Sequence, residues 1–173
     1  AVSYGWPWQA CVDGFKFGAQ TGWATALAGV MLRDPLVRQA IRTCDALVPM
    51  PLHPLRLAER GYNQSLLLAQ ALRRCTDREE KLDRHQAVVR HDWLLRIRNT
   101  QAQSRLSLAQ RLRNIRQAFA VAANQSSQLH GKRVVLVDDV MTSGASAQAA
   151  AQTLRTAGVH QLRVVVFART EKP

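Results

Sequence analysis

The sequence predicts an α/β domain with a mainly parallel central sheet flanked by helices. Two apolar runs of strand length, 134–137 and 162–167, lie on either side of an alanine-rich segment that has the character of a helix. Strands that are apolar throughout are typical of a sheet that helices cover on both faces. The 173 residues are expected to form a single domain, 1–173, with a core of its own.

The first 43 residues are expected to be helical. Trp6-Pro7-Trp8 opens one helix, and Thr21 to Leu32 forms a second helix rich in small residues. Pro35 suits the first position of a third helix, which ends near Thr43, because a proline there lacks only an N–H that would stay unpaired anyway.

The remaining elements follow from apolar runs and from capping signals. Pro49 and Pro51 stop the first strand, because proline cannot donate to a sheet, and Asn63 can cap the next helix. Ser107 to Gln110 has the pattern of a capping box, and Gly158 suits the end of the last helix. The expected strands are 46–48, 88–97, 119–122, 134–137 and 162–167, the later helices begin at 63, 107 and 145, and 124–128 is a polar loop.

Composition restricts the possible classes of protein. The longest uncharged stretch, Phe17 to Leu32, has 16 residues, several of them polar, whereas a bilayer span needs about 20 apolar residues. No basic-then-apolar signal peptide opens the chain. The three cysteines are widely spaced and contain no C-x-x-C pair, which indicates free thiols in a reducing compartment. We therefore expect a soluble cytoplasmic protein without membrane insertion.

The charge is strongly positive and mostly arginine. There are 24 Lys and Arg against 12 Asp and Glu, a net charge of +12. Between Arg84 and Arg116 there are eight arginines and one acid, Asp92. Such a cluster suits a polyanion or a phosphorylated substrate, but an arginine-rich solvated face gives the same pattern. Trp93, among these arginines, is a candidate for stacking an unpaired base.

The segment Val134 to Ser146 carries the most specific chemistry. Asp138 and Asp139 follow a buried strand, at the edge where α/β sheets bind ligands, and two adjacent buried carboxylates are costly unless they have partners. Thr142 to Ser146 then offers hydroxyls and a glycine before a helix, the composition of a phosphate cradle. Two carboxylates can accept hydrogen bonds from the vicinal hydroxyls of a sugar, and the cradle can bind a phosphate. Together they predict a ribose 5-phosphate site.

This segment resembles the 5-phosphoribosyl-1-diphosphate (PRPP) binding motif of type I phosphoribosyltransferases: four apolar residues, two acids, then Thr-Ser-Gly-Ala-Ser. Three further segments resemble the ComF/GntX group of such proteins, whose members are linked to competence, the uptake or use of external DNA. These segments are Phe15 to Phe17, Val48 to Gln64 and Arg96 to Phe119. The resemblance runs from about Tyr4 to Arg169.

The resemblance implies a type I phosphoribosyltransferase fold, with a helical hood at 1–43 and a PRPP-binding core at 44–173. It implies that Asp138 and Asp139 bind the ribose hydroxyls and that Mg²⁺ is bound through the substrate, with the same two carboxylates as possible ligands. Many members of the group carry an upstream four-cysteine zinc module, which is absent from this chain; either this member lacks it or the sequence is a trimmed portion of a longer one. The other implied site residues are Thr142, Ser143, Gly144, Ala145 and Ser146 for the 5-phosphate, Pro49, Met50, Pro51, Leu52 and His53 for the pyrophosphate loop, and Arg60, Arg98, Thr100, Gln103, Arg105 and Arg111 as mobile-loop and phosphate candidates.

Three functions stay open at this point. The chain could transfer the phosphoribosyl group of PRPP to an unknown acceptor, bind PRPP as a catalytically silent sensor, or bind single-stranded DNA as a competence factor. No general base is evident, because His53 is better explained as a hydrogen-bonded loop residue. Lys16 could reach a phosphate or solvate a helix end. Tyr62 and Asn63 could contact the acceptor, although helix capping explains them more simply.

Overall fold

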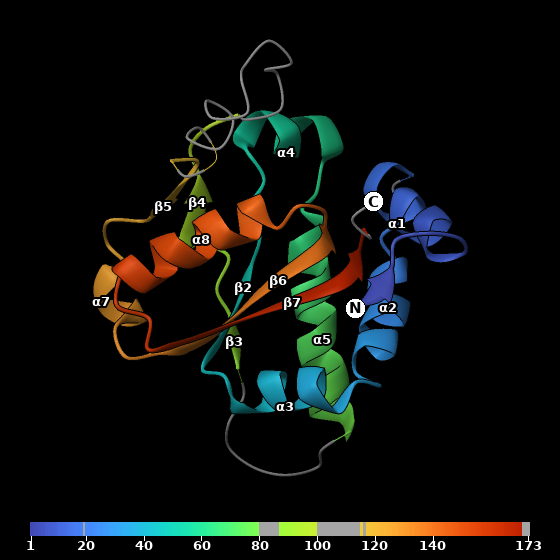
Figure 1. Cartoon of the computed structure of the whole chain (residues 1–173), viewed down its shortest axis with the longest axis horizontal. Coiled ribbons are helices and arrows are strands. Elements are labelled where there is room, and N and C mark those ends of the chain that lie inside the picture. The colour runs from blue at the N-terminus through green and yellow to red at the C-terminus, as the bar shows by residue number, and fades with distance from the viewer. Residues whose placement is uncertain (19, 80–86, 100–114, 116, 171–173) are drawn as a thin grey trace.

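A parallel five-stranded sheet lies at the centre of the computed structural model of the chain (Figure 1). Its strand order is β1-β7-β6-β2-β3, and every neighbouring pair is parallel. The structure describes residues 1–18, 20–79, 87–99, 115 and 117–170. The strands are β1 (Val2–Ser3), β2 (Ala46–Pro49), β3 (Val88–Val89), β6 (Arg133–Met141) and β7 (Gln161–Arg169).

A second, antiparallel sheet pairs β4 (Leu94–Arg96) with β5 (Phe119–Val121). The larger sheet is therefore wholly parallel and the molecule mainly so, as the apolar strands predict. The helices are α1 (Trp8–Phe17), α2 (Trp23–Met31), α3 (Pro35–Thr43), α4 (Pro54–Arg60), α5 (Gln64–Glu79), α7 (Ser126–Leu129) and α8 (Ala145–Thr156).

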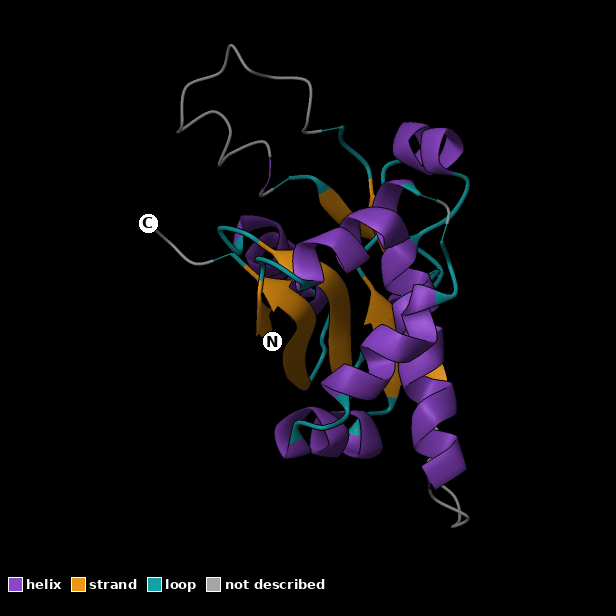
Figure 2. Cartoon of the chain, turned by 90° about the vertical axis from the view of Figure 1, so that its right-hand side faces the viewer, coloured by secondary structure: helices purple, strands orange, loops and turns teal. Residues whose placement is uncertain are grey.

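The side chains of β6 alternate between two cores, one on each face of the sheet, because successive residues of a strand point in opposite directions. Val135 and Val137 pack with residues of α1, α2, α3 and α5. Val134 and Leu136 pack with α8 and with Trp93 and Phe119 near the small sheet. All four side chains are at most 1% exposed, and Figure 2 shows the helices packed beside the strands.

The structure differs from the sequence-based expectation at the amino terminus and at 88–97. Residues 2 and 3 form β1 beside β7, with Val2 opposite Ala168, a pairing too short to give a periodic pattern. The expected strand 88–97 is two strands in different sheets. Arg90 donates to both carboxylate oxygens of Asp92, at 3.0 and 2.9 Å, and this bend redirects the chain from β3 to β4.

Other elements also differ in extent. β6 continues past Val137 to Met141 because β7 pairs with it along its whole length. α4 was not expected, nor was α7, which forms within the polar loop because Leu129 is buried. The expected helix at 107–113 lies outside the described residues. No helix in the described part of the chain is long and apolar enough to cross a membrane.

Asn63 caps α5, as its position predicts, and also holds the loop after β2. Its Oδ1 accepts hydrogen bonds from the backbone N–H groups of Ser65 and Leu66, at 2.9 and 3.3 Å. Its Nδ2 donates to the carbonyl of Met50 at 3.1 Å. One side chain therefore joins the start of α5 to the end of β2.

Replacing Asn63 with alanine should lower the free energy of unfolding by about 1–2 kcal/mol, because both the cap and the loop bond are lost. Asn63→Asp keeps the capping oxygen and should lose less. Urea denaturation measures the stability of both variants. The control is Asn124→Ala, at an exposed turn residue, whose free energy of unfolding should stay within about 0.5 kcal/mol of the parent. An unchanged midpoint for Asn63→Ala would contradict this role.

Candidate functional site

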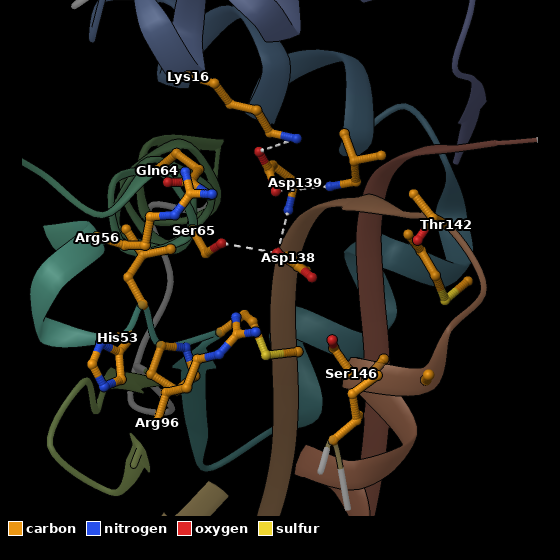
Figure 3. A pocket seen from close by; sticks show the side chains of 18 of the residues that line it. Lys16, His53, Arg56, Gln64, Ser65, Arg96, Asp138, Asp139, Thr142 and Ser146 are labelled. Carbon is orange, nitrogen blue, oxygen red and sulfur yellow. Dashed lines mark hydrogen bonds and ion pairs between the residues drawn. The ribbon is translucent and has the colours of Figure 1, made fainter. Parts of the chain in front are cut away.

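A cavity of about 400 Å³ opens at the carboxyl ends of β2 and β6. It is lined by the loops that follow these two strands, the last turn of α1, α4, the first turn of α5 and part of β4. Figure 3 shows Asp138 and Asp139 between two groups of side chains, with His53, Arg56 and Arg96 on one side and Thr142 and Ser146 on the other. The segments that are predicted to bind the ribose, the 5-phosphate and the pyrophosphate therefore line the same cavity.

The two carboxylates each have a different partner. Lys16 Nζ lies 3.2 Å from Oδ2 of Asp139, and Asp139 is only 3% exposed. Ser65, in the first turn of α5, donates from Oγ to Oδ1 of Asp138 at 3.0 Å. The backbone N–H of Asp139 donates to the same oxygen at 3.0 Å. Lys16 thus forms an ion pair with the buried carboxylate of Asp139, and its role is more than solvation of the end of α1.

Burial raises the pKa of Asp138 to about 8, and the neighbouring Asp139 carboxylate adds to the shift. The Ser65 hydrogen bond acts in the opposite direction, because it favours the charged form. Asp138 is therefore largely protonated at neutral pH. A buried group whose proton is lost only near pH 8 is typical of binding and catalytic sites.

The loop after β6 has the geometry expected of an anion cradle. Gly144 has φ = +77° and ψ = −1°, the left-handed region that glycine adopts without strain, and α8 begins at the next residue. Ser143 Oγ accepts from the backbone N–H of Ala145 at 3.4 Å. Unpaired N–H groups and the dipole at the start of a helix favour a negative ligand. Thr142 and Ser143 are exposed, and they line the cavity with Gly144, Ala145 and Ser146.

The loop after β2 is held by backbone contacts. The N–H of Met50 donates to the carbonyl of Val137 on β6 at 2.8 Å. His53 precedes α4, and its Nδ1 accepts from the N–H of Leu55 at 3.4 Å, the hydrogen-bonded loop role expected from the sequence. Met50, Pro51, Leu52 and His53 line the cavity.

Four cationic side chains line the same cavity: Lys16, Arg56, Arg60 and Arg96. Sequence reasoning gave no role to Arg56 or Arg96, although both lie in segments that resemble the family. Arg96 is half-buried on β4, and burial lowers its pKa, while the ionised form of Asp138 acts in the opposite direction. The guanidinium of Arg60 lies over the ring of Phe17, 5.1 Å from its centroid, and donates to Gln64 Oε1 at 2.6 Å.

Other predicted residues are placed elsewhere or are not described. Arg98 is exposed, whereas its neighbour Asn99 lines the cavity. Thr100, Gln103, Arg105 and Arg111 lie outside the described residues. The expectation that Trp93 stacks an unpaired base is wrong, because Trp93 is 3% exposed and its ring is covered by Arg90 at 4.8 Å. Tyr62 donates from its hydroxyl to the carbonyl of Phe15.

Substituting Asp138 with asparagine should stabilise the protein increasingly as pH rises from about 4 to about 8. The folded-state pKa lies above the unfolded value, so across this window the unfolded chain releases a proton that the folded chain retains, and rising pH favours unfolding. Asparagine does not titrate and avoids this loss. Asparagine also keeps the oxygen that accepts from Ser65. The gain at pH 8 should be at least about 1 kcal/mol, measured by urea denaturation at several pH values.

Asp92→Asn provides a control of opposite sign. The hydrogen bond from Arg90 lowers the pKa of Asp92, so its contribution to stability is present above about pH 4 and is lost as pH falls through the folded-state pKa. Asp92→Asn should therefore destabilise the protein at neutral pH. A gain for Asp138→Asn that does not depend on pH would contradict the assigned cause.

Comparison with known proteins identifies the family. A family model described as Phosphoribosyl transferase domain matches residues 80–173. The chain is 31% identical over 166 residues to Competence protein F of Haemophilus influenzae, covering 94% of this chain and 68% of that protein. It is 30% identical over 175 residues to DNA utilization protein YhgH of Escherichia coli K12, covering 98% and 70%.

Among solved structures, a purine phosphoribosyltransferase from Pyrococcus horikoshii Ot3 is similar with a TM-score of 0.45 and 15% identity, covering 87% of this chain and 85% of that one. The chain spans about two thirds of the length of the two curated relatives. The match to the family model covers more than half of the chain, and the matches to the relatives cover nearly all of it. The chain therefore belongs to the phosphoribosyl transferase domain family, with the type I fold, and within it to the group of Competence protein F and YhgH.

Proposed function

We propose that the chain binds PRPP and that an acceptor displaces pyrophosphate from it. One observation carries this proposal: adjacent carboxylates, the loop before α8 and four cationic side chains line a single cavity of about 400 Å³. A ribose needs hydrogen-bond acceptors, a 5-phosphate needs backbone N–H groups and a diphosphate needs cations. The cavity offers all three next to one another.

Asp138 and Asp139 would bind the ribose hydroxyls. Asp138 is held through Oδ1 by Ser65, which fixes the direction of its carboxyl group. The 5-phosphate would lie against residues 142–146, at the amino end of α8. The 12-residue helix α8 begins there, and the backbone N–H groups and dipole at the amino end of a helix favour a phosphate without a cationic side chain.

The pyrophosphate would lie between the loop 49–53 and the guanidinium groups of Arg56 and Arg96. In the displacement, negative charge accumulates on the departing oxygen, and fixed cations stabilise this charge more in the transition state than in the bound substrate. The protein would also accelerate the displacement by positioning the acceptor next to the reacting carbon.

Mg²⁺ is proposed as the accompanying cation, because a hard divalent ion binds diphosphate and ribose oxygens. Asp138 and Asp139 would supply carboxyl oxygens beside the substrate, and the described residues contain no cluster of three or more His, Cys, Asp or Glu side chains that could hold a metal ion. This donor set fits a cation that is bound mainly through substrate oxygens. The protein's own residues would orient the hydrated ion with the substrate.

The single-stranded DNA function has less support. Trp93 is buried and Arg90 is bound to Asp92, so two residues of the arginine-rich segment serve the packing of the chain. A cytoplasmic location stays part of the proposal. It is supported by the free thiols of Cys11, Cys44 and Cys75, of which Cys44 is buried with its pKa raised to about 12 by that burial.

Calorimetry with PRPP and Mg²⁺ should show saturable binding, and ribose 5-phosphate should compete for it. The double variant Asp138→Asn, Asp139→Asn should lose binding, because each side chain exchanges a carboxyl oxygen for an NH2 group that cannot accept from a ribose hydroxyl. Gly144→Ala should weaken it at least about tenfold, since the positive φ strains any other residue by roughly 1–2 kcal/mol. Gln148→Ala, an exposed control on α8, should bind as the parent does. Unchanged binding by the double variant would overturn the site.

Pyrophosphate release separates a transferase from a sensor. Release on addition of an acceptor, lost in Arg56→Gln but with PRPP still bound, would support transfer. Binding of PRPP without release across bases, amines and aromatic acids would favour the sensor. Affinity for single-stranded DNA that falls steeply with salt would favour the nucleic-acid function.

A further inference from the structure

A cation of the chain itself lies against the acid pair. The ammonium group of Lys16, in the last turn of α1, is 3.2 Å from Oδ2 of Asp139 (Figure 3). Both side chains are largely withdrawn from solvent, since the side chain of Lys16 is 18% exposed and that of Asp139 is 4% exposed. Each charge therefore depends on the other for its stabilisation.

The ion pair compensates one particular oxygen of Asp139. Oδ1 accepts from the backbone N–H of Val140 at 2.9 Å. Oδ2 is buried and has no hydrogen-bond partner among the residues that the structure describes, so its contact with Lys16 is one of charge and not of an aligned hydrogen bond. A buried carboxylate is costly without a compensating charge. In the absence of Lys16, this oxygen would need another cation.

The space beside this oxygen suits one cation and not two. Mg²⁺ binds one or two carboxylates together with water and phosphate oxygens, and the adjacent carboxyl groups of Asp138 and Asp139 meet that description. An ammonium group and a divalent ion next to the same oxygen would repel each other strongly. Arg56, Arg60 and Arg96 line the same cavity and add to the positive potential there. The folded chain therefore disfavours a metal ion that arrives alone.

We propose that Lys16 takes the place of a metal ion at Asp139, so that Mg²⁺ enters the cavity only with the diphosphate of PRPP. The inference rests on the proposed binding of PRPP and concerns how the site acquires its metal. A diphosphate brings enough negative charge to hold the ion among the surrounding cations, whereas the two carboxyl groups alone do not. Lys16 is thus a positioning residue, which acts through Asp139 and keeps the carboxyl oxygens available to the ribose hydroxyls.

Binding of Mn²⁺ alone tests the exclusion of metal. Mn²⁺ takes the same oxygen ligands as Mg²⁺, and the EPR signal of the free ion measures how much is bound. Lys16→Met keeps an unbranched apolar side chain without the charge, and Lys16→Gln also keeps a donor for Asp139. Both variants should bind Mn²⁺ at least about tenfold more tightly than the parent. The matched control Lys132→Met, at an exposed residue before β6, should bind Mn²⁺ as the parent does.

A second substitution assigns the metal to the acid pair. In the double variant Lys16→Met, Asp139→Asn both charges of the ion pair are absent, and the gain in Mn²⁺ affinity should be lost. Equal Mn²⁺ affinity of the parent, Lys16→Met and Lys16→Gln would overturn the inference. A gain that survives Asp139→Asn would overturn it as well.

Thermal unfolding gives a readout that needs no substrate. Lys16→Met should have a lower Tm than the parent in EDTA, because a buried carboxylate loses its cation. Mn²⁺ at ten times its Kd for the variant should raise the Tm of the variant by about 3 °C or more, and that of the parent by no more than about 1.5 °C. Lys16→Gln supplies the same comparison if Lys16→Met does not fold in EDTA. A Tm that Mn²⁺ leaves unchanged in the variant would contradict the inference.

Calorimetry with two ligands separates this inference from the proposed function. Ribose 5-phosphate, which has no diphosphate, should bind the parent with the same affinity, within about twofold, in Mg²⁺ and in EDTA, whereas PRPP should bind at least about tenfold more tightly in Mg²⁺. A tenfold effect of Mg²⁺ on ribose 5-phosphate, or none on PRPP, would overturn the inference. If neither ligand binds, the proposed function fails, and the Mn²⁺ measurements still decide whether Lys16 excludes a metal ion.

Discussion

The arrangement of the pocket depends on one electrostatic constraint, the placement of two neighbouring carboxylates on a largely buried strand. Two adjacent acids in a protein interior cannot both be charged without partners. Here one acid receives a cation and the other a hydroxyl, and each partner comes from a different helix. Lys16 reaches Asp139 from α1, and Ser65 reaches Asp138 from α5. The acids therefore fix the positions of two helices against the end of β6, in addition to forming the site.

The same constraint connects the loops. Ser65 lies two residues after Asn63, which caps α5 and holds the carbonyl of Met50. A short chain of hydrogen bonds thus runs from the loop after β2, through the first turn of α5, to Asp138. The proposed pyrophosphate and ribose contacts are joined by side chains that would not touch either ligand. Cooperative networks of this kind contribute more than separate pairs when every member has a partner.

Much of the fold and of the candidate site could be predicted from the sequence. The residues that could not be predicted have a physical reason in common. The strand 134–137, the acids at 138 and 139 and the glycine before α8 lie within one short segment, so local pattern and local chemistry coincide. Asn63 and Pro35 also carry their signals in their immediate neighbours. Arg56 and Arg96 were missed because their meaning depends on a fold that brings α4 and β4 to the end of β6. Trp93 was misjudged for the same reason, since only the packed structure buries it under Arg90.

The rim helix α4 has a consequence of a different kind. It contains no buried residue, and Leu55 and Leu57 are 59% and 44% exposed. Its two ends are closed locally, since the N–H of Leu55 donates to His53 Nδ1 and the N–H of Gly61 donates to the carbonyl of Leu57 at 2.8 Å. Arg60 connects it to Phe17 and Gln64. Local opening costs least where little apolar surface is buried. The wall that carries Arg56 and Arg60 is therefore held by less buried apolar surface than the floor formed by β6, and its local opening should cost less free energy than opening of that floor.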